Sequence, residues 1–379
     1  MIETTLSNCK LVLADEVISG SLVMNGDKIS GFDHGTAHKS SYDLDGDYLI
    51  PGLVELHTDH LEVHYNPRPG VNWPAVSAVI AHDAQIAGAG ITTVFDALRA
   101  GTFDPGDLSA KDGEKLSRAI TQAQGNGQLR AEHFIHLRCE MPCEDTVDCA
   151  KRTAAAGPVH LISIMDHTPG ARQFTSLDKF REYYLGKKMI LPEKIEAYIV
   201  ERQQLQVRYV PTNKAAILAL AREYGISILS HDDATAAHVD EAVADGVAIS
   251  EFPTTAESAF AARDNGLKIL MGAPNLIRGG SHSGNISTEE VARAGLLDIM
   301  SSDYVPVSLL AAAFELPRRV ETISLPQALA IVSKNPAAAA GLNDRGEIAI
   351  GKRADLVQVH VSQGHPVVRR VWSRGRRVM

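Results

Sequence analysis

The sequence predicts an α/β protein: a distorted (β/α)₈ barrel of the TIM type, with a small β-sandwich formed by both chain ends. Three observations lead to this prediction. Eight apolar, β-rich runs alternate with helical patterns through the middle of the chain. Both ends consist of short alternating strands with Gly, Asn and Asp turns and contain no convincing helix. The length of 379 residues is enough for a barrel of about 250 residues and an accessory domain.

The predicted barrel strands are short apolar runs, and each is followed by a polar turn or a helical pattern. They are Leu49 to Leu56, Thr92 to Phe95, His133 to Cys139, Val159 to Met165, Ile226 to Ser230, Val247 to Ser250, Lys268 to Met271 and Asp298 to Ser302. Helical patterns between them, such as 75–87, 213–224 and 256–265, each close with a glycine at the turn into the next strand.

These patterns divide the chain into three parts. We expect the sandwich to contain residues 1–48 and 341–379, and the barrel to contain residues 49–340. A highly polar stretch near 180–212 lies between two predicted strands. It predicts an inserted helical hairpin over the barrel mouth, a candidate lid.

Composition excludes several classes of function. A net charge of −9 and a pI near 5.9 give no electrostatic basis for binding nucleic acid, and the basic C-terminal segment is typical of a hairpin with solvated arginines. The four cysteines match no zinc or disulfide spacing, so we expect reduced thiols. Without a long apolar run or a leader, the chain is expected to be soluble and cytoplasmic, with no membrane partner. A homo-oligomer is left open.

The first functional signal is the sequence His57-Thr58-Asp59 at the end of the first predicted strand. Residues two apart on a strand point the same way, so an imidazole and a carboxylate can converge on one ion there. We therefore expect a hydrolytic metal site beginning with His57 and Asp59.

Metal-ligand residue types also follow the other predicted strands. They are Glu140 after the third, Asp166 and His167 after the fourth, His231 with Asp232 and Asp233 after the fifth, Glu251 after the sixth and Asp303 after the eighth. Any one of them is commonly a cap or a satisfied polar group. In this fold, however, the C-terminal strand ends meet at one mouth, so together they predict a metal site. His82, His133, His136 and His160 lie inside predicted elements and are interpreted as structural. His34, His38, His360 and His365 belong to the sandwich and are expected at the surface.

Several segments carry a resemblance to a known family. Pro51 to His57 and Gly346 to Val357 resemble the first and last signatures of the amidohydrolase superfamily, which are metal-dependent hydrolases with a barrel and a flanking sandwich. Glu55 to Asp59, Pro67 to Pro74, Met165 to Gly170 and Arg278 to Asn285 resemble the branch of the carbon–phosphorus lyase pathway.

The resemblance implies hydrolysis of α-D-ribose 1-methylphosphonate 5-triphosphate to the 5-phosphate and pyrophosphate, in phosphonate catabolism. It implies one or two divalent ions, zinc first and manganese or iron otherwise, held by His57, Asp59, His167 and His231 to activate water. It also implies that Asp303, the superfamily's carboxylate after the last strand, orients this water and takes its proton. Asp303 is counted with the metal ligands too.

The sequence departs from the commonest superfamily pattern at three places. The first motif is His-x-Asp rather than His-x-His, no lysine ends the fourth strand, and Glu251 stands where a histidine is frequent. A bridging carboxylate must then come from elsewhere, so Glu140 is the first choice and Asp166 the next. Glu251 and His60 are further ligand candidates.

A phosphate site is predicted after the seventh strand. The segment containing Arg278, Gly279, Gly280, Ser281 and His282 offers backbone N–H groups, hydroxyls and a cation, the composition of an anion nest. An ordinary glycine-rich loop is the alternative. Further candidates for phosphate contacts, each of which can instead be a solvated or paired arginine, are Arg68, Arg99, Arg138 and Arg172.

Two other functions stay open at the level of sequence. A cyclic-amide hydrolase or deaminase on the same scaffold could use the same metal ligands against carbon, with less need for the arginine and glycine loop. A metal-free scaffold protein of the same fold is the alternative of another class, and absence of bound metal in the purified protein would favour it.

Overall fold

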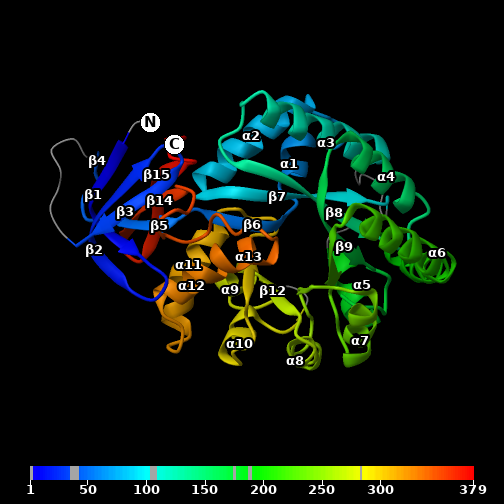
Figure 1. Ribbon diagram of the computed structural model, residues 1–379. Helices are drawn as coiled ribbons and strands as arrows, with labels where there is room; N and C mark the ends of the chain where they lie inside the picture. Colours follow the sequence, from blue (N-terminus) through cyan, green and yellow to red (C-terminus); the bar gives the residue numbers. More distant parts are fainter. Residues whose placement is uncertain (1–2, 35–41, 103–108, 174–175, 187–189, 282–283) are drawn as a thin grey trace.

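The computed structural model describes residues 3–34, 42–102, 109–173, 176–186, 190–281 and 284–379. Its centre is an eight-stranded parallel sheet in the order β13-β12-β11-β10-β9-β8-β7-β6, which curls into a barrel with helices outside (Figure 1). An isolated parallel bridge between Thr58 and Asp303 brings the first and last strands together. The predicted (β/α)₈ barrel is confirmed.

All eight predicted barrel strands are present, with boundaries shifted by a few residues. They are β6 (Leu53–Thr58), β7 (Ile91–Ala100), β8 (Glu132–Glu140), β9 (Val159–Met165), β10 (Ser227–His231), β11 (Ile249–Glu251), β12 (Lys268–Gly272) and β13 (Ile299–Ser301).

Helices follow the strands and cover the outside of the barrel. They are α1 (Leu61–Tyr65), α2 (Ala75–Gly88), α3 (Ala110–Gly125), α4 (Thr146–Ala156), α5 (Leu177–Gly186), η1 (Pro192–Lys194), α6 (Ile195–Tyr224), α7 (Ala236–Asp245), α8 (Ala256–Asp264), α9 (Ala273–Arg278), α10 (Thr288–Arg293), α11 (Ser308–Arg319), α12 (Leu325–Ile331) and α13 (Lys334–Ala339). Among these described helices, none has both the length and the apolar character needed to cross a bilayer.

The two chain ends combine in a second sheet at one side of the barrel (Figure 1). Its strands are β1 (Glu3–Val12), β2 (Val17–Asn25), β3 (Lys28–Asp33), β4 (Tyr42–Asp43), β5 (Tyr48–Pro51), β14 (Leu356–Ser362), β15 (His365–Ser373) and β16 (Arg376–Arg377). Chain-end strands meet where β14 pairs antiparallel with β5. The C-terminal hairpin is present, with Arg374 and Gly375 at its turn.

The first predicted barrel strand needs a correction. The run from Leu49 to Leu56 was expected to be one strand, but it divides between two sheets. Its first part, in β5, pairs with β1 and β14, whereas the barrel strand β6 begins only at Leu53. Gly52 lies between them, with its N–H donated to Asp355 O, so the chain can pass from one sheet to the other.

An ionic network joins the two sheets at the start of β8. Glu132 accepts hydrogen bonds from Arg345, Arg353 and Arg374, which all belong to the C-terminal part of the chain. The basic C-terminal segment predicted solvated arginines, but Arg374 is paired with Glu132. Burial raises the pKa of Glu132, but the hydrogen bonds and charges of Arg353 and Arg345 hold it below its ordinary value.

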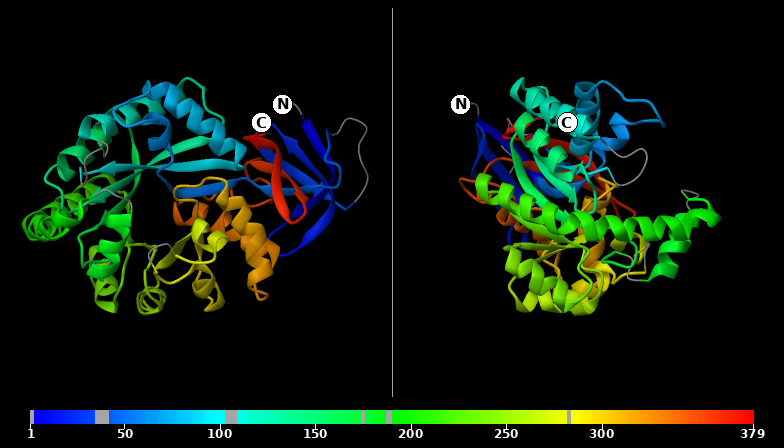
Figure 2. Two further views of the ribbon diagram at one scale, coloured as in Figure 1. Left: turned by 180° about the vertical axis from the view of Figure 1, so that it is seen from behind. Right: turned by 90° about the vertical axis from the view of Figure 1, so that its right-hand side faces the viewer.

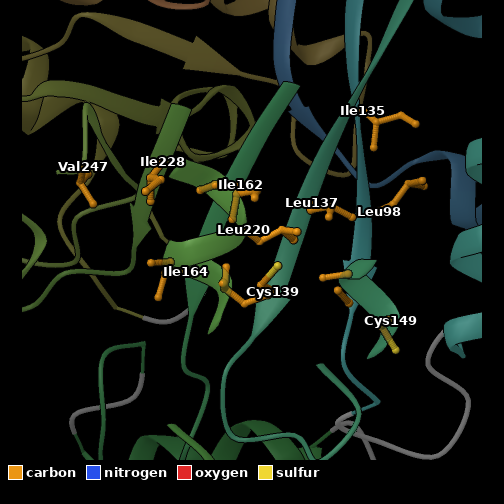
Figure 3. Close-up of a cluster of buried hydrophobic side chains, with 14 of the residues drawn as sticks. Leu98, Ile135, Leu137, Cys139, Cys149, Ile162, Ile164, Leu220, Ile228 and Val247 are labelled. Atoms are coloured by element: carbon orange, nitrogen blue, oxygen red, sulfur yellow. The ribbon is translucent and has the colours of Figure 1, made fainter. Parts of the chain in front are cut away.

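Strand alternation separates the inner and outer faces of the barrel. Outward side chains of β7 to β10, such as Leu137, Cys139 and Ile162, pack with Leu220 of α6 in an apolar layer (Figure 3). Inward side chains, such as Leu161, Leu229 and Ile249, form the apolar floor of the barrel. Side chains two residues further along a strand point the same way. At the mouth of the barrel these next inward residues are polar, as with His231 after Leu229 and Glu251 after Ile249.

The polar stretch near 180–212 forms helices, although its role as a lid stays a proposal. The helix α5 packs on the N-terminal part of α6 through Phe180, Tyr184, Ile195 and Ile199. Both project from the barrel on one side (Figure 2). The helix that was expected to begin at Asn213 is the C-terminal part of the 30-residue α6, which continues through Pro211.

Candidate functional site

A cavity of about 150 Å³ opens at the C-terminal end of the barrel. Its walls bring together four side chains of the predicted metal site: His57, His167, His231 and Asp303. They come from the ends of β6, β9, β10 and β13. The convergence expected from the strand ends is therefore present in the structure.

The Nδ1 atom of each of the three histidines is hydrogen-bonded to a buried carboxylate. Glu251 accepts from His57 Nδ1 through one oxygen and from His231 Nδ1 through the other, both at 2.7 Å. Glu140 accepts from His167 Nδ1 at 2.5 Å and from the His167 N–H at 2.9 Å. A proton on Nδ1 leaves the Nε2 lone pair free to bind something else, which is how protein carboxylates orient metal-binding imidazoles.

The Nε2 atoms of His167 and His231 share a small volume with Asp232. Its Oδ2 lies 3.5 Å from His231 Nε2 and 3.7 Å from His167 Nε2. Within the described part of the chain, Asp232 Oδ2 and His57 Nε2 are buried and have no hydrogen-bond partner. Buried polar atoms without a partner are costly, so an occupant is needed. His167, His231 and Asp232 form a donor group that fits a divalent cation such as zinc, and His57 lines the same cavity as a further donor.

Glu251 lies at the centre of this arrangement. It is completely buried, and it also accepts from Ser163 Oγ, whose other contact is the ring of His136. Burial alone raises the pKa of a carboxyl group, but the interaction with His57 and the hydrogen bonds from His231 and His57 hold that of Glu251 well below its ordinary value. Burial lowers the pKa of His136 to about 4, so this ring is neutral. It is linked to Glu251 through Ser163 Oγ.

Asp303 faces the cavity next to His57. Its backbone N–H donates to His57 O at 3.0 Å, and Thr58 Oγ1 donates to its carbonyl at 2.7 Å. Burial and the neighbouring charge of Asp59 raise the pKa of Asp303 to about 6. A carboxylate with that pKa is suited to accept a proton near neutral pH.

Asp232 and Asp303 share an unusual backbone conformation. Their φ angles are 56° and 53°, in the left-handed region that non-glycine residues adopt rarely. Asp232 directly follows β10, and Asp303 is the second residue after β13, so this conformation turns each side chain from a strand end into the mouth. Such strain is characteristic of functional sites, and Asp tolerates it better than branched residues do.

Glu55 connects the first and last strands of the barrel. One of its oxygens accepts from His57 N–H at 2.8 Å and from Ser301 Oγ, and the other accepts from Ser302 N–H at 2.6 Å. Burial raises the pKa of Glu55 to about 6, against these hydrogen bonds. This buried carboxylate therefore fixes His57 relative to the strand that precedes Asp303.

Two of the predicted metal ligands are engaged elsewhere. Asp59 Oδ2 lies 3.1 Å from Arg138 Nη1, and Asp59 does not line the cavity. Both oxygens of Glu140 contact His167. The geometry therefore does not favour Glu140, the first choice, as a bridging carboxylate, and Asp232 is the carboxylate that faces the histidines.

The further ligand candidates also lie outside the converging group. Asp166 accepts from Thr168 N–H and from Gln206 Nε2 of α6. His60 contacts Tyr304 O and Gln85 Oε1, both at 3.1 Å. Glu251 does not line the cavity, and its two oxygens accept hydrogen bonds from the Nδ1 atoms of His57 and His231.

The predicted phosphate loop is only partly available. Arg278, Gly280 and Ser281 line the cavity, whereas His282 lies outside the described residues. The Gly279 and Gly280 N–H groups donate to Leu276 O and Asn275 O, so these two groups are not available to an anion, and the anion nest stays a prediction. These two glycines cap the C-terminus of α9, which leaves the Arg278 side chain as the cation of this loop.

Of the other arginine candidates for phosphate contacts, one lines the cavity and three do not. Arg138 lines the cavity. Arg172 is paired with Asp233 and Glu241 outside it, and Arg68 is exposed on the loop after α1. Arg99, at the end of β7, does not line the cavity, although its charge acts on Glu140.

Some cavity residues were not predicted to be ligands or substrate contacts, although Asp232 was noted beside His231 after the fifth strand. They are Asp232, Gln173, Asn275, Asn285 and Tyr304. Asp232 directly follows a predicted ligand at a strand exit, so a signal existed, but the backbone turn that distinguishes it from Asp233 is visible only in the structure. The others are neutral residues on loops, which carry no comparable signal.

Comparison with known proteins places this chain in the amidohydrolase family. The Amidohydrolase family matches residues 196–379. The chain is 47% identical over 375 residues to the α-D-ribose 1-methylphosphonate 5-triphosphate diphosphatase of Escherichia coli K12, covering 98% of this chain and 99% of that protein. It is 25% identical to the imidazolonepropionase of Deinococcus deserti, over 90% of this chain and 87% of that protein.

Solved structures show the same fold at low sequence identity. The N-isopropylammelide isopropylaminohydrolase of Burkholderia multivorans matches with a TM-score of 0.64 and 18% identity, covering 100% of this chain and 98% of that one. This likeness shows the architecture of the barrel and the second sheet, and it says nothing about the substrate.

Proposed function

This chain belongs to the amidohydrolase family and is a hydrolase, and we propose that it converts α-D-ribose 1-methylphosphonate 5-triphosphate to the 5-phosphate and pyrophosphate. The observation that carries the proposal is one cavity that holds both a metal-type donor set and the arginines Arg138 and Arg278. A charged ribose triphosphate does not cross a membrane unaided, so we place the reaction in the cytoplasm, in phosphonate catabolism.

We propose that His57, His167 and His231, through Nε2, hold one divalent ion together with Asp232. Nitrogen-rich sites of this kind favour zinc over magnesium or calcium. When bound, the ion would supply positive charge beside the α-phosphoryl oxygens and lower the pKa of a neighbouring water molecule. The carboxylates of Glu140 and Glu251 would keep the histidine rings oriented, and Asp303 would take the proton of the attacking water.

The leaving pyrophosphate requires a cation outside the donor set. Arg278 lies on the exposed side of the same cavity, at the end of α9. We propose that its guanidinium binds the β- and γ-phosphates, because charge-assisted contacts are the strong ones available to a phosphate chain. A neutral cyclic amide has no group that needs this contact.

Phosphorus NMR of the products tests the function directly. The purified protein, loaded with zinc, is incubated with α-D-ribose 1-methylphosphonate 5-triphosphate. We expect a pyrophosphate signal and a 5-phosphate monoester, because cleavage occurs at the α-phosphorus. Release of orthophosphate would contradict this cleavage position. Turnover of a cyclic amide without turnover of the triphosphate would favour an amide hydrolase, and a purified protein that binds no divalent metal would favour the scaffold alternative.

The variant Arg278→Ala separates the triphosphatase from an amide hydrolase. Removing one charge-assisted contact costs about 1.5 to 3 kcal/mol, so we expect kcat/KM for the triphosphate to fall roughly tenfold to hundredfold. The loss should be much smaller for any neutral amide or ester that the protein turns over weakly, because only the triphosphate places negative charge at this residue.

A matched control is Arg118→Ala, since Arg118 is an exposed arginine of α3 paired with Glu114, outside the cavity. This variant should keep normal kcat/KM. Equal losses on charged and neutral substrates in Arg278→Ala would mean that Arg278 supports the fold rather than the phosphate chain.

A further inference from the structure

Arg138 is the cationic residue of the cavity that lies next to the reacting groups. Strand β8 places His136, Arg138 and Glu140 on the inward face by simple alternation. Arg138 is only 8% exposed and lines the cavity together with His57 and Asp303. Its charge acts on both of these residues. Arg278, in contrast, is exposed at the rim.

The guanidinium of Arg138 is incompletely paired. Its Nη1 contacts Asp59 Oδ2 at 3.1 Å, and it makes no other hydrogen bond within the part of the chain that the structure describes. Its Nε is buried without a partner. A buried guanidinium has five N–H donors, and leaving most of them unused is costly. An anion in the cavity can accept the remaining donors.

The partner of Arg138 was itself expected to bind metal. Asp59 is two residues after His57, but β6 ends at Thr58 and the Asp59 carboxylate is directed to Arg138. A histidine at this position could not neutralise a buried arginine, whereas an aspartate can. This gives a physical reason for the His-x-Asp pattern in place of His-x-His.

We propose that Arg138 binds a non-bridging oxygen of the α-phosphoryl group as negative charge develops there, and that Asp59 is its positioning residue rather than a metal ligand. This rests on the proposed function. In the reaction, the water oxygen bonds to the α-phosphorus, the bond from that phosphorus to the bridging oxygen breaks, and pyrophosphate leaves with the bond electrons. The water proton goes to Asp303. The Arg138 guanidinium stays protonated throughout and lowers the energy of the crowded phosphorus centre.

The decisive measurement on Asp59 is metal content, which does not depend on any substrate. In Asp59→Asn we expect the zinc content of the purified protein to equal that of the wild type, with kcat lowered about tenfold because Arg138 loses its anchor. A zinc content as low as that of His231→Ala would overturn the assignment of Asp59. This readout stands even when the wild type proves to act on another substrate.

For Arg138, kcat and KM are measured separately, and added guanidinium ion is tested for its ability to restore activity. In Arg138→Ala we expect kcat for the triphosphate to fall about a hundredfold to a thousandfold, with KM and zinc content little changed. Added guanidinium ion should restore part of kcat, which no purely structural role predicts. The variant Arg138→Lys should retain more activity than the alanine variant, because it keeps one charge.

Arg130→Ala is the matched control, since Arg130 also pairs with a buried aspartate, Asp83, but lies outside the cavity. It should keep normal kcat and show no response to guanidinium. Unchanged kcat in Arg138→Ala, or a loss that guanidinium does not rescue in a protein with normal thermal unfolding, would overturn the proposal. Failure of the triphosphate reaction in the wild type would instead contradict the proposed function.

Discussion

Replacing Asp303 by asparagine should lower kcat by at least about two orders of magnitude while most of the metal stays bound. Asparagine has nearly the same shape, tolerates the left-handed backbone at φ 53°, and can still accept a hydrogen bond. It cannot take up a proton. Steady-state kinetics and metal analysis of the same preparation measure the two effects separately.

The pH profile adds a second check on Asp303. Burial and the Asp59 charge raise its pKa to about 6, and a divalent cation bound beside it would lower this value. A base acts only when deprotonated, so activity should be present above this pKa and lost as the pH falls through it. We therefore expect an acidic limb at or below pH 6 in the wild type.

Asp166→Asn is a suitable control, because Asp166 is also a carboxylate after a barrel strand but does not line the cavity. This variant should keep its turnover. Near-normal turnover in Asp303→Asn would move the general base to another carboxylate, and Asp232 is then the first to examine, since it faces the same cavity.

Loss of a histidine from the donor set should have an equally large effect. In His231→Ala, and in His57→Ala, we expect loss of most bound metal and most activity, because each removes one of a few converging Nε2 donors. Metal content by elemental analysis and kcat/KM for the triphosphate measure this.

These variants are also expected to lose some stability. Exposed ligands contribute little to packing, but His57 is 0% and His231 is 5% exposed, and both hydrogen-bond Glu251. Removing either ring takes a partner from a buried carboxylate, at about 1 to 3 kcal/mol. Thermal unfolding should therefore accompany the metal analysis.

The control is His238→Ala, since His238 is a half-buried histidine outside the cavity. This variant should keep normal metal content. Normal metal content in His231→Ala would rule out the donor set.

Several features of the site followed from local pattern alone. Apolar runs with β-branched residues predicted the strands, and parallel strands in a barrel present their C-terminal ends at one mouth. For that reason His57, His167, His231 and Asp303 could be expected to meet, although they are far apart in the sequence. Their chemical roles are still predictions until the variants are measured.

Other features depended on contacts that no local pattern contains. Two predicted donors, Asp59 and Glu140, have the right residue type at the right strand ends. Their carboxylates are directed to Arg138 and His167, and this depends on which side chains neighbouring strands bring alongside. The Gly279 and Gly280 N–H groups similarly cap α9, because the helix ends there.

The sequence by itself determined the barrel, the sheet formed by both chain ends and the set of strand ends that meet at the mouth. These depend on periodicity and strand order, which are properties of the chain. Only the tertiary structure decided which member of that set faces the cavity and which supports it. Asp232 and Glu251 show why: a backbone turn at φ 56° aims the first into the mouth, and complete burial between two histidines makes the second their support.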